Sequence, residues 1–170
     1  MSNEQILRQC FALLVDNQPG VLARVVGMFA GRGYNIDSLT VDKVDVKSNL
    51  SRIMIVSHGT REALDQVTAQ LQRLMPVRRL LNLTEAGPLV ERSCALLKVK
   101  GDEAQRTKAV ALAEGAGAKE IEQTDTTVMF EICAAPQQVA DLIEALRSVG
   151  LAEIASSGSV AMGSGETTIL

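Results

Sequence analysis

The order of apolar segments along the chain limits its possible folds more than any other feature of the sequence. Apolar runs and helical apolar stripes follow one another as strand, helix, strand, strand, helix, strand, and the same order returns after a Gly87-Pro88 break. This order is typical of the ferredoxin-like α+β unit. The sequence therefore predicts two tandem ferredoxin-like βαββαβ domains, although the two halves show no detectable repetition of sequence.

In the first half, short apolar runs that end at polar turns predict strands, and apolar residues at helical spacing predict helices. The stripe on the first helix consists of Leu22, Val25, Val26 and Phe29. Gly33 follows this helix, as is common just after a helix end. The predicted helices are 21–32 and 61–74, and the predicted strands are 10–15, 35–42, 52–57 and 77–83.

The second half follows the same criteria. Helices are expected at 103–116 and 137–147, and strands at 93–100, around 121, at 126–134 and at 151–161. The predicted domains are therefore residues 1–83 and 92–163, joined by a linker at 84–91. Residues 164–170 are small and polar except for the last two, so we expect a flexible tail that frays.

Both faces of the first predicted sheet are apolar. Side chains alternate along a strand, so Leu13 and Val15 point to one face and Ala12 and Leu14 to the other. Residues 53–56 repeat this pattern in the third strand. Two helices can cover only one face, so something should cover the free face or the free edge of the sheet, and a second subunit is the natural candidate. We therefore expect an oligomer.

Composition and charge exclude several classes of function. The chain has 17 Lys and Arg against 20 Asp and Glu, which is a poor match for a nucleic-acid-binding surface. No apolar segment approaches the ~20 residues of a membrane span, and residues 1–5 do not resemble the start of a secretion signal.

Cys10, Cys94 and Cys133 each lie among apolar residues, which indicates buried, reduced thiols in a cytoplasmic protein. His58 is the only histidine and has no evident carboxylate partner, so no metal site is expected.

The segment Asp16–Gly20, between the first strand and the first helix, is the best candidate for a ligand site. A helix N-terminus favours an anion through its N–H groups and its dipole, and Gly20 lets a ligand approach the backbone. Asn17 offers a donor and an acceptor, and Asn35 opens the next strand, which we expect beside the first. A carboxylate at the helix end and an ammonium near the two Asn side chains would describe a free amino acid. These residues leave open a second interpretation, a helix that Asn17 simply caps.

Residues 11–41, FALLVDNQPGVLARVVGMFAGRGYNIDSLTV, resemble the opening of an ACT domain. More narrowly, NxPGVLxRVxGxF at 17–29 and RGYNIxSLTV at 32–41 are similar to the small regulatory subunit of acetohydroxyacid (acetolactate) synthase. Ser51-Arg52-Ile53 and Leu89-Val90-Glu91-Arg92 extend the resemblance over nearly the whole chain. The loop 43–49 departs from some relatives, and we expect it to influence effector preference.

The resemblance implies a regulatory subunit with no active site and no cofactor of its own. Subunits of this family bind a large catalytic subunit, which holds thiamine diphosphate, Mg²⁺ and FAD and acts in valine, leucine and isoleucine biosynthesis. They raise its activity and confer feedback inhibition, usually by valine, which lies at the interface of two ACT domains. A homodimer is therefore implied. The matching positions are Asn17, Gly20 and Asn35, with Val21, Leu22 and Ile36 as neighbours.

Three other functions are compatible with the predicted fold. A stand-alone double ACT-type sensor would bind another amino acid and act on another enzyme, and would not co-purify with a large thiamine-dependent enzyme. An acylphosphatase needs an Arg in the first loop, whereas Asp16–Gly20 has no Arg and contains an acid. An RNA-binding sheet needs exposed aromatic residues with basic residues around them. The predicted strands offer only Phe11, Tyr34 and Phe130, and basic residues do not surround these three.

Overall fold

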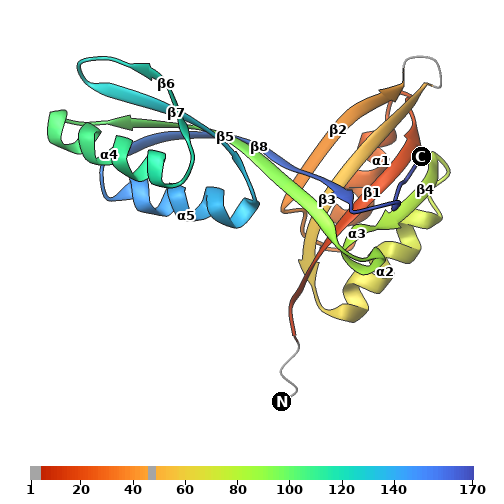
Figure 1. The fold of residues 1–170 in the computed structure, drawn as a ribbon. Helices are drawn as coiled ribbons and strands as arrows, with labels where there is room; N and C mark the ends of the chain where they lie inside the picture. Colours follow the sequence, from red (N-terminus) through yellow and green to blue (C-terminus); the bar gives the residue numbers. More distant parts are fainter. Residues whose placement is uncertain (1–4, 46–48) are drawn as a thin grey trace. The chain divides into compact units, whose positions relative to one another are not determined.

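The computed structural model describes residues 5–45 and 49–170, and the chain divides into two units (Figure 1). The first unit combines the chain up to Val90 with Val160–Leu170, and the second unit spans Glu91–Ser159. The second unit is thus an insertion in the first, because the chain leaves the first unit and later returns to it. Among the described residues, no helix is long and apolar enough to cross a membrane.

The first unit has the order of elements that the sequence predicts. Its elements are β1 (Leu7–Asp16), α1 (Val21–Ala30), β2 (Ser38–Asp45), β3 (Leu50–Gly59), α2 (Arg61–Gln72) and β4 (Val77–Asn82). The strands pair antiparallel in the order β2-β3-β1-β4. α2 begins after Thr60, whose hydroxyl accepts a hydrogen bond from the Ala63 amide at 3.3 Å, as expected of an N-cap residue.

The second unit repeats this order. Its elements are β5 (Leu89–Lys100), α4 (Glu103–Gly115), β6 (Lys119–Gln123), β7 (Thr127–Ala134), α5 (Pro136–Arg147) and β8 (Leu151–Gly163). The sheet order is β6-β7-β5-β8. α4 begins in a capping box: Asp102 accepts from the Gln105 amide at 2.8 Å, and the Gln105 side chain accepts from the Asp102 amide at 3.0 Å. The prediction of two tandem ferredoxin-like α+β domains is confirmed.

Residues 84–91, expected as a linker, are structured. Leu83–Ala86 form the short helix α3, and β5 already begins at Leu89. The Leu83 side chain is buried, and the Thr84 hydroxyl accepts a hydrogen bond from the Cys10 amide at 3.0 Å. These contacts fix the segment against β1, which explains why it does not behave as a free linker.

One face of each sheet packs against two helices. In the first unit, Phe11, Leu13 and Val15 of β1 are buried beneath α1 and α2. In the second unit, β5 alternates strictly, with Ala95 and Leu97 buried beneath α4 and α5 and the residues between them on the opposite face. Because that opposite face is open, Cys94 is only half-buried and Cys133 is exposed. The expectation of three buried thiols is therefore correct for Cys10 alone.

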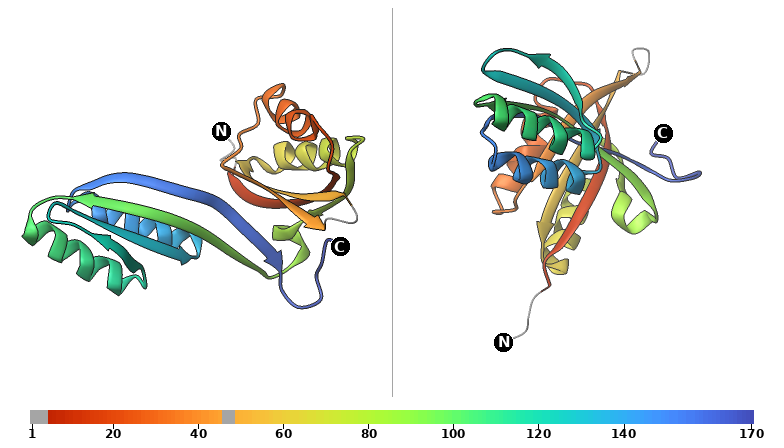
Figure 2. Two further views of the ribbon diagram at one scale, coloured as in Figure 1. Left: turned by 90° about the horizontal axis from the view of Figure 1, so that it is seen from above. Right: turned by 60° about the vertical axis from the view of Figure 1, so that its left-hand side comes forward.

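The second face of the first sheet is covered by the chain itself. The strand residues on this face are buried: Cys10, Ala12, Leu14, Met54 and Val56. They cluster with Leu83 of α3, with Ala161 at the end of β8, and with Ile169. Figure 2 (left) shows α1 and α2 on one side of this sheet, and α3 with the C-terminus on the other. A cover is present, as the sequence leads us to expect, but it does not come from a second subunit.

The expectation that residues 164–170 form a frayed tail is wrong. Ile169 is 5% exposed, and the Arg79 guanidinium donates to the carbonyl oxygens of Ile169 and Leu170 at 3.2 and 2.9 Å. A buried apolar anchor and two hydrogen bonds therefore hold the segment. The division of the chain changes accordingly, because the residues from Val160 onward belong to the first unit and not to the second.

We expect Ile169→Ala to destabilise the first unit. Removing a buried isoleucine side chain costs about 2–5 kcal/mol, and a terminal segment can also open locally, so we expect a loss of about 2 kcal/mol in the free energy of unfolding. The protein has one tyrosine, Tyr34, and no tryptophan. Its fluorescence in a urea titration therefore reports on the first unit.

Leu170→Ala is the matched control for this variant. The Leu170 side chain belongs to a residue that is 67% exposed, so its truncation should change the free energy of unfolding by less than about 0.5 kcal/mol. An Ile169→Ala chain with the wild-type urea midpoint would contradict the packing of the C-terminal segment.

Candidate functional site

The loop Asp16–Gly20 is held by the strands beside it. The Asn17 amide donates to the Asn49 carbonyl at 2.8 Å. Arg78 Nε of β4 donates to Asp16 Oδ1 at 2.8 Å, and this hydrogen bond raises the pKa of Arg78. The acid of the loop is thus engaged by Arg78.

Gly20 is the N-cap of α1, with φ 82° and ψ −3°. Residues with a side chain rarely adopt this left-handed conformation, so glycine suits the position. Within the described part of the chain, no side chain caps α1, and its first turn contains no acidic residue. The interpretation of a helix capped by Asn17 is therefore wrong. The positive end of the α1 dipole lies next to the exposed residues 18–20, and the described first turn of α1 contributes no anionic side chain to neutralise it.

Asn35 precedes β2 and is oriented by two neighbours. Its Nδ2 donates to Asp37 Oδ1 at 2.6 Å, and its carbonyl accepts from the Ser57 hydroxyl at 2.6 Å. Asp37 also contacts His58, whose Nδ1 lies 2.7 and 2.9 Å from the two carboxylate oxygens. Asn35 therefore belongs to a small polar group at the start of β2.

His58 has the carboxylate partner that the sequence pattern does not reveal. β2 pairs antiparallel with β3, and this register sets Ser38 opposite Val56. Asp37 therefore lies next to His58, although the two residues are 21 positions apart. The pair follows from the pairing of β2 with β3, whereas the sequence leads us to expect the strand after Asn35 beside the first strand.

The two groups of predicted site residues lie at opposite ends of the first sheet. The Asn17 amide is hydrogen-bonded to the carbonyl of Asn49, which precedes β3. The Asn35 carbonyl is hydrogen-bonded to the hydroxyl of Ser57, near the end of β3. At about 3.3 Å per strand residue, these ends are about 25 Å apart, far more than the length of a free amino acid. β3 also lies between β1 and β2, so the expectation that the strand after Asn35 adjoins the first strand is wrong.

The six predicted residues differ in what they offer a ligand. Three of them present polar or backbone groups at the surface: Asn17, Gly20 and Asn35. Leu22 is 41% exposed on α1, whereas Val21 is 5% exposed and its side chain belongs to the core. Ile36 is partly buried and packs against the same core. Val21 therefore offers little surface to a ligand, and its amide already donates to the Gln18 carbonyl at 3.3 Å.

The described residues show no sign of a metal centre. Among residues 5–45 and 49–170, no group of three or more His, Cys, Asp or Glu side chains could hold a metal ion. The loop 43–49, expected to influence effector preference, includes residues 46–48, which lie outside the described residues.

Two family models match the chain in succession. Residues 11–79 match the ACT domain described as AHAS small subunit-like, and residues 92–165 match the model described as small subunit of acetolactate synthase. The first match contains all six predicted site residues, and the second contains the C-terminal domain expected from the sequence.

Several relatives match over nearly their whole length. A probable acetolactate synthase small subunit of Archaeoglobus fulgidus is 35% identical, over 92% of this chain and 96% of that protein. The acetolactate synthase small subunit of Haemophilus influenzae is 33% identical, over 96% of this chain and 100% of that protein. The crystal structure of the acetolactate synthase small subunit from Thermotoga maritima has a TM-score of 0.81 at 32% identity, over 95% of this chain and 99% of that one. The chain therefore belongs to the acetolactate synthase small subunit family, with an ACT domain in its first unit.

Proposed function

We propose that the chain is the regulatory subunit of acetolactate synthase and binds valine for feedback inhibition. It has no catalytic role of its own. The reaction takes place on a large catalytic subunit that holds thiamine diphosphate, Mg²⁺ and FAD, and this chain binds and activates that subunit. Family membership supports the partnership. The observation that supports the effector site is the N-terminus of α1 at Gly20, which no side chain in the described part of the chain caps.

The start of α1 suits the carboxylate of an amino acid. Backbone N–H groups and the helix dipole favour an anion at this position. Gly20 leaves open space, since a Cβ built there meets no atom of the described residues within 4 Å. Asn17, three positions earlier in the loop, offers a further donor, and the exposed Leu22 side chain offers apolar contact to the aliphatic side chain of valine. This end of the sheet forms the carboxylate half of the site.

The start of β2 suits the ammonium group. Asn35 donates through Nδ2 to Asp37, which orients its Oδ1 as an acceptor for an ammonium. Ile36 follows and adds apolar surface at the edge of the core. Since this half lies about 25 Å from Gly20 within one chain, a single copy cannot bind both ends of valine.

Two copies of the first unit bring the halves together. β2 is an edge strand, and Val41 on it is 47% exposed. If two β2 strands pair antiparallel about a two-fold axis, the start of each lies beside the end of the other. The end of β2 pairs with Leu50, as does the end of β1, so it lies at the Asn17 end of the sheet. A homodimer through β2 therefore forms two equivalent sites, each with Asn17 and Gly20 from one copy and Asn35 from the other.

Binding at such an interface supplies a mechanism for feedback. Valine that bridges two copies favours the arrangement of the dimer in which the two halves are closest. If that arrangement inhibits the catalytic subunit, binding of the catalytic subunit must in turn change the affinity for valine by the same factor.

Mixed dimers test the divided site. Gly20→Asp places a carboxylate where the carboxylate of valine binds, and Asn35→Ala removes the acceptor for its ammonium, so neither variant alone should bind valine. A mixed dimer keeps one intact site, formed by Gly20 of one chain and Asn35 of the other. If the chains pair at random in an equimolar mixture, calorimetry should recover about a quarter of the wild-type binding capacity for valine.

Gly117→Asp is the matched control for Gly20→Asp. Gly117 also has a positive φ, 76°, and an added Cβ there meets no described atom within 4 Å, but Gly117 lies in the second unit. This variant should bind valine as the wild type does. If the mixture of folded, dimeric Gly20→Asp and Asn35→Ala chains recovers no binding, the site is not shared between two copies.

Reconstitution tests the regulatory role. Added to the large subunit of acetolactate synthase, the wild-type chain should raise the rate of acetolactate formation, and valine should lower that rate. Gly20→Asp should still activate, but the valine concentration for half-inhibition should rise more than about tenfold, or about 1.4 kcal/mol. Unchanged valine inhibition in this variant would remove the site assignment. Failure of the wild-type chain to bind and activate the large subunit would favour a stand-alone amino-acid sensor.

A further inference from the structure

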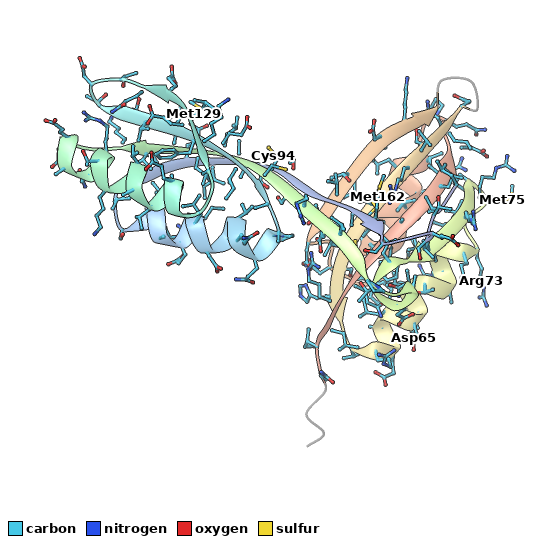
Figure 3. The ribbon with its side chains drawn as sticks, viewed as in Figure 1. Asp65, Arg73, Met75, Cys94, Met129 and Met162 are labelled. Atoms are coloured by element: carbon cyan, nitrogen blue, oxygen red, sulfur yellow. The ribbon has the colours of Figure 1, made fainter. Side chains whose placement is uncertain are left out.

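Two cysteines share the open face of the second sheet. Cys94 of β5 is half-buried and Cys133 of β7 is exposed, and both are free thiols. Cys94 and Met129 are labelled in Figure 3, on the face of the sheet away from α4 and α5. The third cysteine, Cys10, is fully buried in the first unit. The chain therefore presents two accessible thiols on one surface and keeps the third enclosed.

The register of β5 and β7 sets these two thiols directly opposite each other. Cys94 pairs with Cys133 in the antiparallel ladder. Residues directly opposite each other in such a ladder project from the same face of the sheet, with Cβ atoms about 4.5–5.5 Å apart. The two residues are 39 positions apart in the sequence, so no local motif predicts that they pair.

Cys94 and Cys133 form a non-hydrogen-bonded pair of the ladder, which means that their backbone groups do not bond to each other. The Gly101 amide donates to the Thr126 carbonyl at 3.0 Å in the same register, which makes that pair a hydrogen-bonded one. Bonded and non-bonded pairs alternate along an antiparallel ladder, so Cys94 and Cys133, seven steps away, form a non-bonded pair. The Cys94 amide agrees with this, because it donates to the Ser157 hydroxyl of β8 at 3.1 Å instead of to β7.

A non-bonded pair has the spacing that a disulfide needs. Its Cα atoms are about 4.5 Å apart and its side chains are closer than in a bonded pair. A disulfide accepts Cα separations of about 4.4–6.8 Å and Cβ separations of about 3.5–4.5 Å. The Cβ atoms of a non-bonded pair lie at the short end of the range for facing residues, which meets this second requirement. The bond would therefore join β5 to β7 without a change in their register.

We propose that Cys94 and Cys133 form a reversible cross-strand disulfide, with a small-molecule disulfide such as oxidised glutathione as the oxidant. One protein thiolate attacks the glutathione disulfide, which forms a mixed disulfide and releases one glutathione thiol. The second protein thiolate attacks the protein sulfur of the mixed disulfide and releases the second glutathione. The two cysteines lose two protons and two electrons, and the reagent takes them up as two thiols.

The location of the pair makes the bond both accessible and reversible. β5 and β7 are the two central strands of the sheet order β6-β7-β5-β8, so the bond crosses the middle of the open face. Exposed disulfides are among those that small thiols reduce readily, and disulfides of this kind serve as redox sensors inside cells. The second unit thus contains a dithiol whose state follows the surrounding thiol–disulfide balance.

Mass spectrometry of the full chain tests the proposal. After treatment with oxidised glutathione, the intact protein should lose the mass of two hydrogens and gain no glutathione. Alkylation after unfolding should then label Cys10 alone, whereas the reduced chain should be labelled at all three cysteines. Dithiothreitol should restore full labelling.

Single substitutions distinguish the Cys94–Cys133 disulfide from the addition of glutathione to a single thiol. Cys94→Ser and Cys133→Ser each leave one surface thiol, which should retain one glutathione because no second thiol can displace it. Cys10→Ser is the control and should behave as the wild type. The proposal is overturned if the wild-type chain accumulates glutathione while the other surface cysteine stays open to alkylation, or if oxidation links two chains instead of two strands.

Discussion

The first sheet is apolar on both faces, and much of the structure depends on covering both of them. α1 and α2 bury one face, as they do in any βαββαβ unit. The other face is closed by Leu83, Ala161 and Ile169. Two of these residues follow the second unit in the sequence, so the chain has to return to the first unit. The insertion of one unit within the other is thus tied to the hydrophobic cover of a single sheet.

The same topology divides the candidate site. α1 leads back along the sheet from the end of β1, so Gly20 and Asn35 fall at opposite ends of the unit even though only α1 and a short turn separate them in sequence. Among residues 5–45 and 49–170, no side chain caps the N-terminus of α1 and its first turn contains no acid, and the start of β2 presents an oriented Asn35. The start of α1 suits the carboxylate of an amino acid and the start of β2 suits its ammonium group, and neither end can bind the whole ligand alone. In the function proposed here, dimer formation and effector binding are therefore one event.

Local patterns predict most of the fold, because apolar spacing and turn residues act over a few positions. They give the order of the twelve main elements found in residues 5–45 and 49–170, and the glycine at the start of α1. They fail where long-range packing decides. Ile169 is one of two large apolar residues in a polar tail, and only the tertiary structure shows the apolar face that it covers. The Asp37–His58 contact and the opposition of Cys94 and Cys133 depend on strand register, which the sequence alone does not fix.

The central claim is that valine binds between two copies of the first unit. Sedimentation equilibrium of the isolated chain, with and without valine, tests it most directly. A ligand that needs both copies must strengthen their association, so valine at about 100 times its Kd should lower the dissociation constant of the dimer by at least about tenfold. A dissociation constant that stays the same while calorimetry shows valine bound would contradict the claim, because the site would then lie within one copy.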